Sequence, residues 1–490
     1  MSISSALSTT KQIFSNTGTQ TSVTSTNMAN TQNANYAKRT AVLASSGNGA
    51  VVATISREQN EPLLRQSITS TSLASGQSTL ATGLEEIRSL LGGNDYELSM
   101  SAKMTALLNN IGAYSAKPSE STLASTVVSS AQDVVNTLNT TSNELQAIRA
   151  RADAEMKTQV DKLNNLLGQF ETANTAIMQA AAMGTQDNNA LDTRDSLVKQ
   201  ISEIVGISST IRAGNDMALY TTDGTTLFET IPRKVDFTAT TTYTADTVGQ
   251  KITIDGEELK AGVGGDTNAS GSLQALRQIR DGVAVTYQSQ LDEMARGLVK
   301  AFAEVLPTDP AGSFGAVAGL FTYKEGGAEQ FDVPSDADST GLSARIMVSS
   351  ALTPPTGVPT LLRDGGINDA GYKWNTNNDS SYSSLLDRYV GMMQASQTFD
   401  AASGGTDKDL MSYASDSTGW LEALRSSSAT ATETKSAMQS RAAEALSSET
   451  GVSLDEELSL LLDIEQSYKA ASKLVSTIDE MLSALLNAAG

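Results

Sequence analysis

The chain contains neither cysteine nor histidine among its 490 residues. Without cysteine it cannot form a disulfide, a thiolate nucleophile or a zinc–thiolate site. Without histidine it has no imidazole base, which excludes Ser-His-Asp catalysis and histidine metal ligands. No pair of carboxylates stands out from the many acidic residues as a general acid and base. We therefore expect no catalytic residue, no metal and no cofactor.

Basic residues are also scarce. The chain has 34 lysines and arginines against 55 aspartates and glutamates, a formal net charge of −21. Nucleic acids and anionic membranes attract basic surfaces, so this balance argues against both as partners. No run of about 20 apolar residues predicts a transmembrane helix. The first residues, "MSISSALSTTKQIFSNTGTQTSV", lack the basic and apolar regions of a cleaved signal peptide, and we expect none.

Aromatic residues make up only 5% of the chain, whereas alanine, serine and threonine are abundant. This composition is typical of long helices that pack through small side chains. The last forty residues, from Gly451 to Gly490, contain no proline and no internal glycine. Ser453 is expected to cap a helix there, with Glu456 as the capping-box partner.

Apolar residues in this C-terminal stretch alternate at spacings of three and four. They are Leu461, Ile464, Tyr468, Ala471, Val475, Ile478, Leu482 and Leu485. Such spacing is typical of a coiled-coil seam, although an ordinary amphipathic helix packed on a globular domain is the alternative.

The N-terminus carries a weaker heptad pattern. Leu7, Phe14, Thr21 and Met28 are seven residues apart, and Ile3, Thr10, Thr17 and Thr24 fill the alternate positions. A threonine-rich seam needs a more apolar partner, so we predict that the two ends of the chain pair. The pair would bury little apolar surface, which favours largely disordered ends in the soluble monomer and helices only after assembly.

The middle of the chain alternates between helical and β patterns. Helices are expected over residues 60–92 and 119–183, and "NNALDTRDSLVKQISEIVGI" predicts another, with Leu197, Val198 and Ile201 buried and its charges on a solvated face. From about Ser208 the pattern changes. "DMALYTTDGTTLFET" predicts strand, turn and strand, and "TATTTYTADT" and "KITIDGEEL" continue it. A long helix is expected from residue 272, and helices dominate again from residue 383.

These patterns predict a mainly α fold with a β insertion. We expect paired N- and C-terminal coiled-coil helices (residues 1–45 with 451–490) and an elongated helical-bundle domain (46–207 with 272–450). Residues 306–382 would form a loop-rich insertion in the bundle. Residues 208–271 would form a nested outer β domain, removable with a short linker.

Two stretches resemble the family of flagellar rod, hook and hook-associated proteins. "MANTQNANYAK" (28–38) is similar to the segment after the first helix of that family, and Ala29, Asn30 and Tyr36 match. Ala34 and Asn35 stand where the family has proline and glycine. Asparagine tolerates the left-handed turn conformation, so the turn can persist.

The C-terminal stretch is similar to the terminal helix of the same family without a gap. The shared residues are Gly451, Val452, Leu454, Asp455, Glu456, Glu457, Gln466, Tyr468, Ala470, Thr477, Ile478, Asp479, Glu480 and Met481. "LDTRDSLVKQISEIVGI" and the helix over 272–304 resemble the members that form the hook–filament junction. The similarity is weak over 210–270 and 306–380.

The resemblance implies a structural axial protein of the bacterial flagellum. Such a chain would leave the cell through the flagellar type III channel without a cleaved signal peptide and form an extracellular ring that joins hook to filament. Its implied partners are further copies of itself, the hook protein, the second hook–filament junction protein and an export chaperone. The candidate assembly interface comprises Leu7, Phe14, Met28, Leu461, Ile464, Tyr468, Val475, Ile478, Leu482 and Leu485.

Three alternatives stay open. Another axial protein would fit the same termini, although the hook protein is dominated by β-structure and the second junction protein is usually shorter and lacks the match over 191–207. A flagellum-borne enzyme is a second possibility, but a metalloprotease insertion needs HExxH, which this chain cannot supply. A cytoplasmic helical signalling rod would explain neither the turn at Asn30–Tyr36 nor the β insertion.

Overall fold

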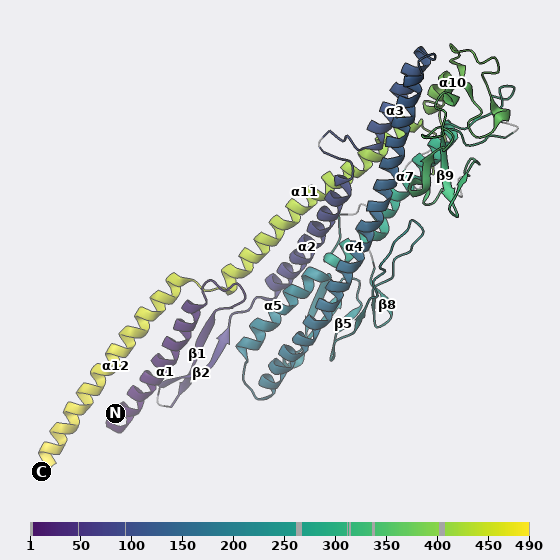
Figure 1. Ribbon diagram of the computed structural model, residues 1–490. Helices are drawn as coiled ribbons and strands as arrows, with labels where there is room; N and C mark the ends of the chain where they lie inside the picture. The colour runs from purple at the N-terminus through teal and green to yellow at the C-terminus, as the bar shows by residue number, and fades with distance from the viewer. Residues whose placement is uncertain are drawn as a thin grey trace.

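The computed structural model describes residues 3–47, 49–93, 95–260, 267–310, 312, 315–335, 339–400 and 407–489. Helices make up 61% of the chain, and the sheets are small. The molecule is elongated, with both chain ends at one tip (Figure 1). The predicted fold class, mainly α with paired terminal helices and a β insertion, is confirmed.

Four elements form what we call the terminal unit: α1 (Ile3–Ala29), β1 (Arg39–Ser46), β2 (Gly49–Arg57) and α12 (Leu454–Ala489). Helices α1 and α12 run antiparallel, and the β1–β2 hairpin lies beside α1 (Figure 1). The Asn16 side chain of α1 donates to Ala50 O (2.6 Å) and accepts from Val52 N (3.1 Å). An amide from α1 thus bonds the backbone of β2 and ties the hairpin to the helix.

The remaining helices form what we call the rod. Its first helices are α2 (Glu61–Ser89), α3 (Met100–Ala116), α4 (Ser121–Ala182) and α5 (Asn188–Ile204). After the β segment follow α6 (Ser272–Arg277), a π-helical turn (Gln278–Val283), α7 (Ala284–Ala301), α10 (Ser384–Met393) and α11 (Leu410–Thr450). Helix α4 has 62 residues, and α11 returns antiparallel to α2 towards the terminal unit (Figure 1).

Helix α3 was not among the predicted helices. It buries Met104, Leu107, Ile111 and Tyr114, spaced three, four and three residues apart, and Ser99 caps it by accepting from Ala102 N at 3.2 Å. The periodic signal was therefore present in the sequence. The predicted helices end at residue 92 and resume at residue 119, and the stretch between them was left unassigned.

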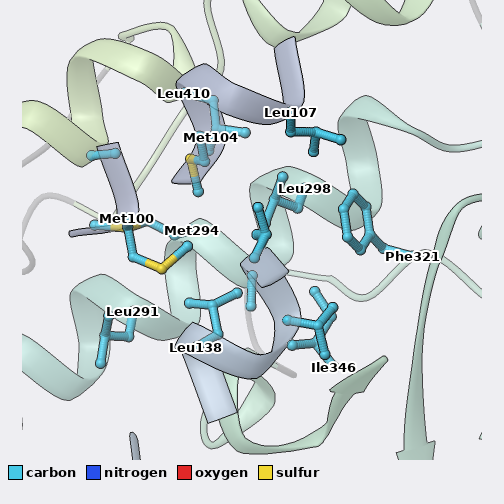
Figure 2. Packing of buried hydrophobic residues seen from close by; sticks show 14 of the residues in the cluster. Met100, Met104, Leu107, Leu138, Leu291, Met294, Leu298, Phe321, Ile346 and Leu410 are labelled. Carbon is cyan, nitrogen blue, oxygen red and sulfur yellow. The ribbon is translucent and has the colours of Figure 1, made fainter. Parts of the chain in front are cut away.

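One hydrophobic core fills the end of the rod away from the termini. Side chains from α3, α4, α7 and α11 meet there around Met104, Leu138 and Leu298 (Figure 2). A sheet of order β10-β9-β11 closes it and contributes Phe321 and Ile346. Its strands and the adjoining short helices are β9 (Phe321–Glu325), β10 (Ala328–Gln330), β11 (Ile346–Val348), α8 (Leu342–Arg345) and α9 (Leu361–Asp364).

The β segment forms two three-stranded sheets against the second half of α4. Their strands are β3 (Ile207–Ile211), β4 (Met217–Thr221) and β5 (Thr226–Phe228), then β6 (Val235–Asp236), β7 (Thr253–Ile254) and β8 (Glu257–Glu258). The predicted turn at Asp223 and Gly224 joins β4 to β5. The ring of Phe228 meets that of Phe170 edge-on, with centroids 4.8 Å apart. The segment therefore shares a core with α4 and α5.

The expected strand over "TATTTYTADT" is absent, and charged rod side chains hold this stretch instead. Asp153 accepts from Thr240 N and, at 2.9 Å, from the Tyr243 hydroxyl. Arg149 donates to Thr244 O at 3.1 Å and to Thr247 O at 2.7 Å. Three backbone groups of 240–247, Thr240 N, Thr244 O and Thr247 O, thus find partners on α4 in place of a neighbouring strand.

Because of this shared core, we expect deletion of residues 208–270 to destabilise the rod, which is the opposite of what a removable domain would show. The ends do meet, because Gly206 N donates to Ser270 O at 3.1 Å. However, the deletion would expose the apolar side of α4, and each large side chain that loses its burial costs roughly 1.5–3 kcal/mol. We expect the unfolding temperature, measured by circular dichroism, to fall by at least about 10 °C. Parental stability together with normal motility of the deletion strain would restore the removable-domain interpretation.

Candidate assembly interface

The seam between α1 and α12 is one row of side chains wide. Helix α12 buries Glu457, Ile464, Ala471 and Ile478, each seven residues from the next. Helix α1 buries Thr10, Thr17, Thr24 and Asn27. Thr10 and Thr17 donate their hydroxyls to Ala6 O (2.9 Å) and Ile13 O (3.0 Å) of their own helix. These two threonines can line the seam because their donors are already satisfied.

The ten predicted interface residues differ in how far the α1–α12 pair buries them. Phe14 and Tyr468 meet edge-on across the pair, with ring centroids 5.0 Å apart, and Ile464 and Ile478 are buried. Phe14, Met28 and Leu461 are partly buried. Tyr468, despite its contact with Phe14, and the remaining four residues keep much of their surface in solvent: Leu7 50%, Tyr468 53%, Val475 37%, Leu482 40% and Leu485 55%. The predicted C-terminal seam has two rows, one with Tyr468, Val475 and Leu482 and one with Ile464, Ala471 and Ile478. Helix α1 buries only the second row.

Helix α12 exposes further large apolar side chains outside that seam. They are Leu454, Leu458, Leu460, Leu462, Leu474, Met481 and Leu486. Within the described residues, α1 is the only helix that packs along α12. Clustered exposed apolar residues mark interaction surfaces in soluble proteins. The geometry leaves α12 with more apolar surface than its one neighbour can cover.

A buried polar network lies at the base of the α1–α12 pair, where α1 ends and α12 begins. Asn27 donates to Glu457 Oε1 and to Arg39 O, both at 2.9 Å, and accepts from the Tyr36 hydroxyl (2.7 Å) and Arg39 N (3.1 Å). Burial raises the pKa of Tyr36, so its hydroxyl stays a donor at neutral pH. Sequence reasoning missed this network, although Tyr36 and Glu457 both lie in the stretches that resemble the flagellar family.

The start of α12 departs from the predicted capping box. Ser453 Oγ accepts from Glu456 N at 3.4 Å, as a cap would. The Glu456 carboxylate, however, pairs with Lys38 Nζ at 2.6 Å. The ion pair instead links α12 to the segment that leads into β1.

The charges of α5 were expected to lie on a solvated face, which is wrong for three of them. Arg194 is buried and donates to Asn174 Oδ1 and Asn215 O, and Asp192 and Asp195 pair with arginines of the hairpin. Arg39 Nη2 lies 2.9 Å from Asp192 Oδ2, and Arg57 Nε lies 2.6 Å from Asp192 Oδ1. Arg57 Nη2 lies 2.7 Å from Asp195 Oδ2. Because Asp192 and Asp195 pair with arginines far away in the sequence, helical periodicity could not reveal these contacts. Leu197, Val198 and Ile201 are buried, as predicted.

The surroundings of this cluster favour the charge on Arg57 but disfavour the charge on Asp195. Burial alone would lower the pKa of Arg57, but the carboxylates of Asp195 and Asp192 outweigh it and raise that pKa. Burial raises the pKa of Asp195, and Arg57 opposes the shift. The Arg57 guanidinium and the Asp195 carboxylate lie 2.7 Å apart, at the distance of a charge-assisted hydrogen bond.

A pocket of about 450 Å³ lies between the two parts of the molecule. The turn over residues 30–37, the starts of α2 and α5 and the end of α11 surround it, and Leu64, Ile68 and Leu191 line it. No group of metal-binding side chains occurs among the residues that the structure describes, and no described helix is long and apolar enough to cross a membrane.

Two family models match the chain. The model of the flagellar hook-associated protein FlgK helical domain matches residues 84–309, and that of the flagellar basal body rod FlgEFG protein C-terminal region matches residues 445–488. The matched ranges together cover more than half of the chain. The second range contains most of α12, the helix that carries the exposed apolar residues.

Similar proteins carry a consistent name. Flagellar hook-associated protein 1 of Bacillus subtilis is 24% identical over 438 residues, which cover 84% of this chain and 80% of that protein. Flagellar hook-associated protein 1 of Salmonella typhimurium is 24% identical over 57% of this chain, and the match spans about half (52%) of that protein. The solved flagellar hook junction protein FlgK from Burkholderia pseudomallei has the same fold, with a TM-score of 0.56 at 11% identity over 78% of this chain and 99% of that one. The chain is thus similar to flagellar hook-associated protein 1 over most of its length and matches the helical domain of that family over residues 84–309.

Proposed function

We propose that this chain is a subunit of the ring that joins the flagellar hook to the filament, and that its terminal unit packs against the terminal units of neighbouring copies. The observation that carries this proposal is the apolar surface of α12, which one threonine-rich helix cannot cover. Neighbouring copies would bury Tyr468, Val475 and Leu482. The same helices would line the inner tube of the axial structure.

The proposed partners follow from this position. The hook protein lies on one side of the ring and the second junction protein on the other, and a chaperone covers α12 before secretion. The match to a hook-associated helical domain over residues 84–309 favours this function over that of a hook protein or of the second junction protein. The family is flagellar, and we propose that the chain reaches the cell exterior through the flagellar type III channel.

Two experiments in the bacterium that carries this protein test the proposal: the phenotype of a deletion strain and the position of the protein on the flagellum. A deletion strain is expected to build hooks that carry no filament and to release filament subunits into the medium. Immunogold labelling of the complemented strain should mark the hook–filament boundary. Filaments of normal length on the deletion strain, or label along the whole hook, would contradict the proposal.

We expect no hydrolytic activity, because the chain offers no histidine or cysteine for acyl or metal chemistry. The purified chain should leave peptidoglycan and casein intact during prolonged incubation. Turnover that one carboxylate substitution abolishes would support the alternative of a flagellum-borne enzyme.

A further inference from the structure

The terminal unit touches the rod through few apolar contacts. None of its described residues belongs to the hydrophobic cores of the rod. None of its four elements packs extensively against a described helix or strand of the rod. Two short linkers join the parts covalently: residues 58–60 between β2 and α2, and residues 451–453 between α11 and α12. Packing alone therefore does not fix the angle between the two parts.

Polar contacts at the base of the hairpin bridge this boundary instead. Arg39 and Arg57 stand opposite each other as the first pair of the β1–β2 ladder, so the hairpin presents both guanidinium groups to α5. Asp192 and Asp195 receive them, and Asn189 Oδ1 accepts from Arg39 Nη2 at 2.7 Å. These four charged side chains are 8–17% exposed, so solvent screens them little.

Hydrogen bonds to the backbone complete the boundary. Asn188 Nδ2 donates to Ile55 O at 3.0 Å, and Lys38 N donates to Thr450 O at 2.8 Å. The pocket of about 450 Å³ lies beside these contacts, under the turn over residues 30–37.

We propose that Arg39, Arg57, Asp192 and Asp195 form a latch that holds the terminal unit at one angle to the rod, and that the unit turns as one body about residues 58–60 and 451–453 when the latch opens. This gives the stretch "DTRDS" a role beyond helix formation. The purpose of the latch rests on the proposed function, because in a junction subunit the latch would set the angle at which the terminal unit meets neighbouring copies. The latch itself is a property of the single chain.

Distance measurements between two spin labels test the latch. The parent has no cysteine, so Ser459→Cys at the base of α12 and Thr172→Cys on α4 label two defined, exposed sites in the full chain. Double electron–electron resonance should give one narrow distance distribution for this labelled parent. In the Asp192→Asn and Arg57→Gln variants we expect that distribution to become at least twice as wide, with helical content unchanged by circular dichroism.

Two further variants make the result specific. Asp195→Asn removes one arm of the latch and should widen the distribution less than Asp192→Asn. Asp161→Asn, the matched control, removes an exposed ion pair with Lys157 within α4 and should leave the distribution unchanged. A broad distribution in the parent, or unchanged widths in both latch variants, would overturn the proposal. Since no assembly is involved, such a failure is distinct from a failure of the chain to form the junction.

Discussion

Val475→Asp is expected to leave the unfolding temperature of the soluble chain within about 2 °C of the parent and to abolish junction assembly. Val475 is 37% exposed in the single chain, so a carboxylate there stays hydrated. In the proposed ring, a neighbouring copy would cover the same position. Burying an unpaired carboxylate costs on the order of several kcal/mol per subunit, repeated around the ring.

The assay adds purified chain to isolated hook tips and counts those that acquire a junction by electron microscopy. Gln466→Glu is the matched control, because it adds the same charge to α12 at an exposed position away from the predicted seam. It should assemble like the parent. Normal assembly of Val475→Asp would show that this row of α12 faces solvent in the ring.

Asp153→Ala is expected to lower the free energy of unfolding by about 3–5 kcal/mol, because it breaks a buried ion pair on one side. Asp153 and Arg280 are both fully buried and paired with each other. Burial disfavours the charge on Arg280, yet the carboxylates of Asp281 and Asp153 raise its pKa, so it stays charged. The substitution would also leave Thr240 N and the Tyr243 hydroxyl without their acceptor.

Thermal unfolding followed by circular dichroism measures this effect, and a fall of about 3–5 °C is expected for a chain of this length. Asp161→Ala on the same helix is the control, because its pair with Lys157 is exposed and worth less than about 1 kcal/mol. Equal shifts for the two variants would show that the buried cluster does not hold residues 240–247 on the rod.

The heptad spacing of the C-terminal stretch predicted a helix and its pairing with the N-terminus, and both are present. It did not predict which row of apolar residues meets α1. The buried row is the one that contains Ala471, because a small residue lets α1 approach closely, whereas Tyr468 and Val475 stay at the edge. The heptad pattern shows that α12 has an apolar surface wide enough for more than one partner helix. Among the described residues of a single chain only α1 packs on it, and the pattern does not say on which row.

Contacts between distant segments were beyond sequence reasoning for a different reason. Nothing local to "DTRDS" marks Asp192 as a partner of Arg39 and Arg57, because the pairing depends on how the hairpin sits on the rod. The same holds for residues 240–247. Their sequence pattern predicts a strand, but in the structure Arg149 and Asp153 of α4 hydrogen-bond to their backbone. Helix α3, in contrast, carried its own periodic signal.

The narrow seam also refines where the ends are expected to be disordered in the monomer. Asn27, Tyr36 and Glu457 anchor the base through buried hydrogen bonds. Towards the tip, the exposed Leu7, Leu482 and Leu485 contribute little burial, too little to offset the ordering of both helices. We therefore expect fraying to begin at the tip and to stop near the anchored base.

Hydrogen exchange of the full chain, compared between the soluble monomer and the junction assembled on hook tips, tests the central claim that the terminal unit is completed by its neighbours. In the monomer, amides of residues 3–17 and 468–489 should exchange nearly as fast as in an unfolded peptide, while those of α4 and α7 are protected. In the assembled junction, the same terminal amides should become strongly protected. Terminal amides as well protected in the monomer as those of α4, or unchanged after assembly, would contradict the account.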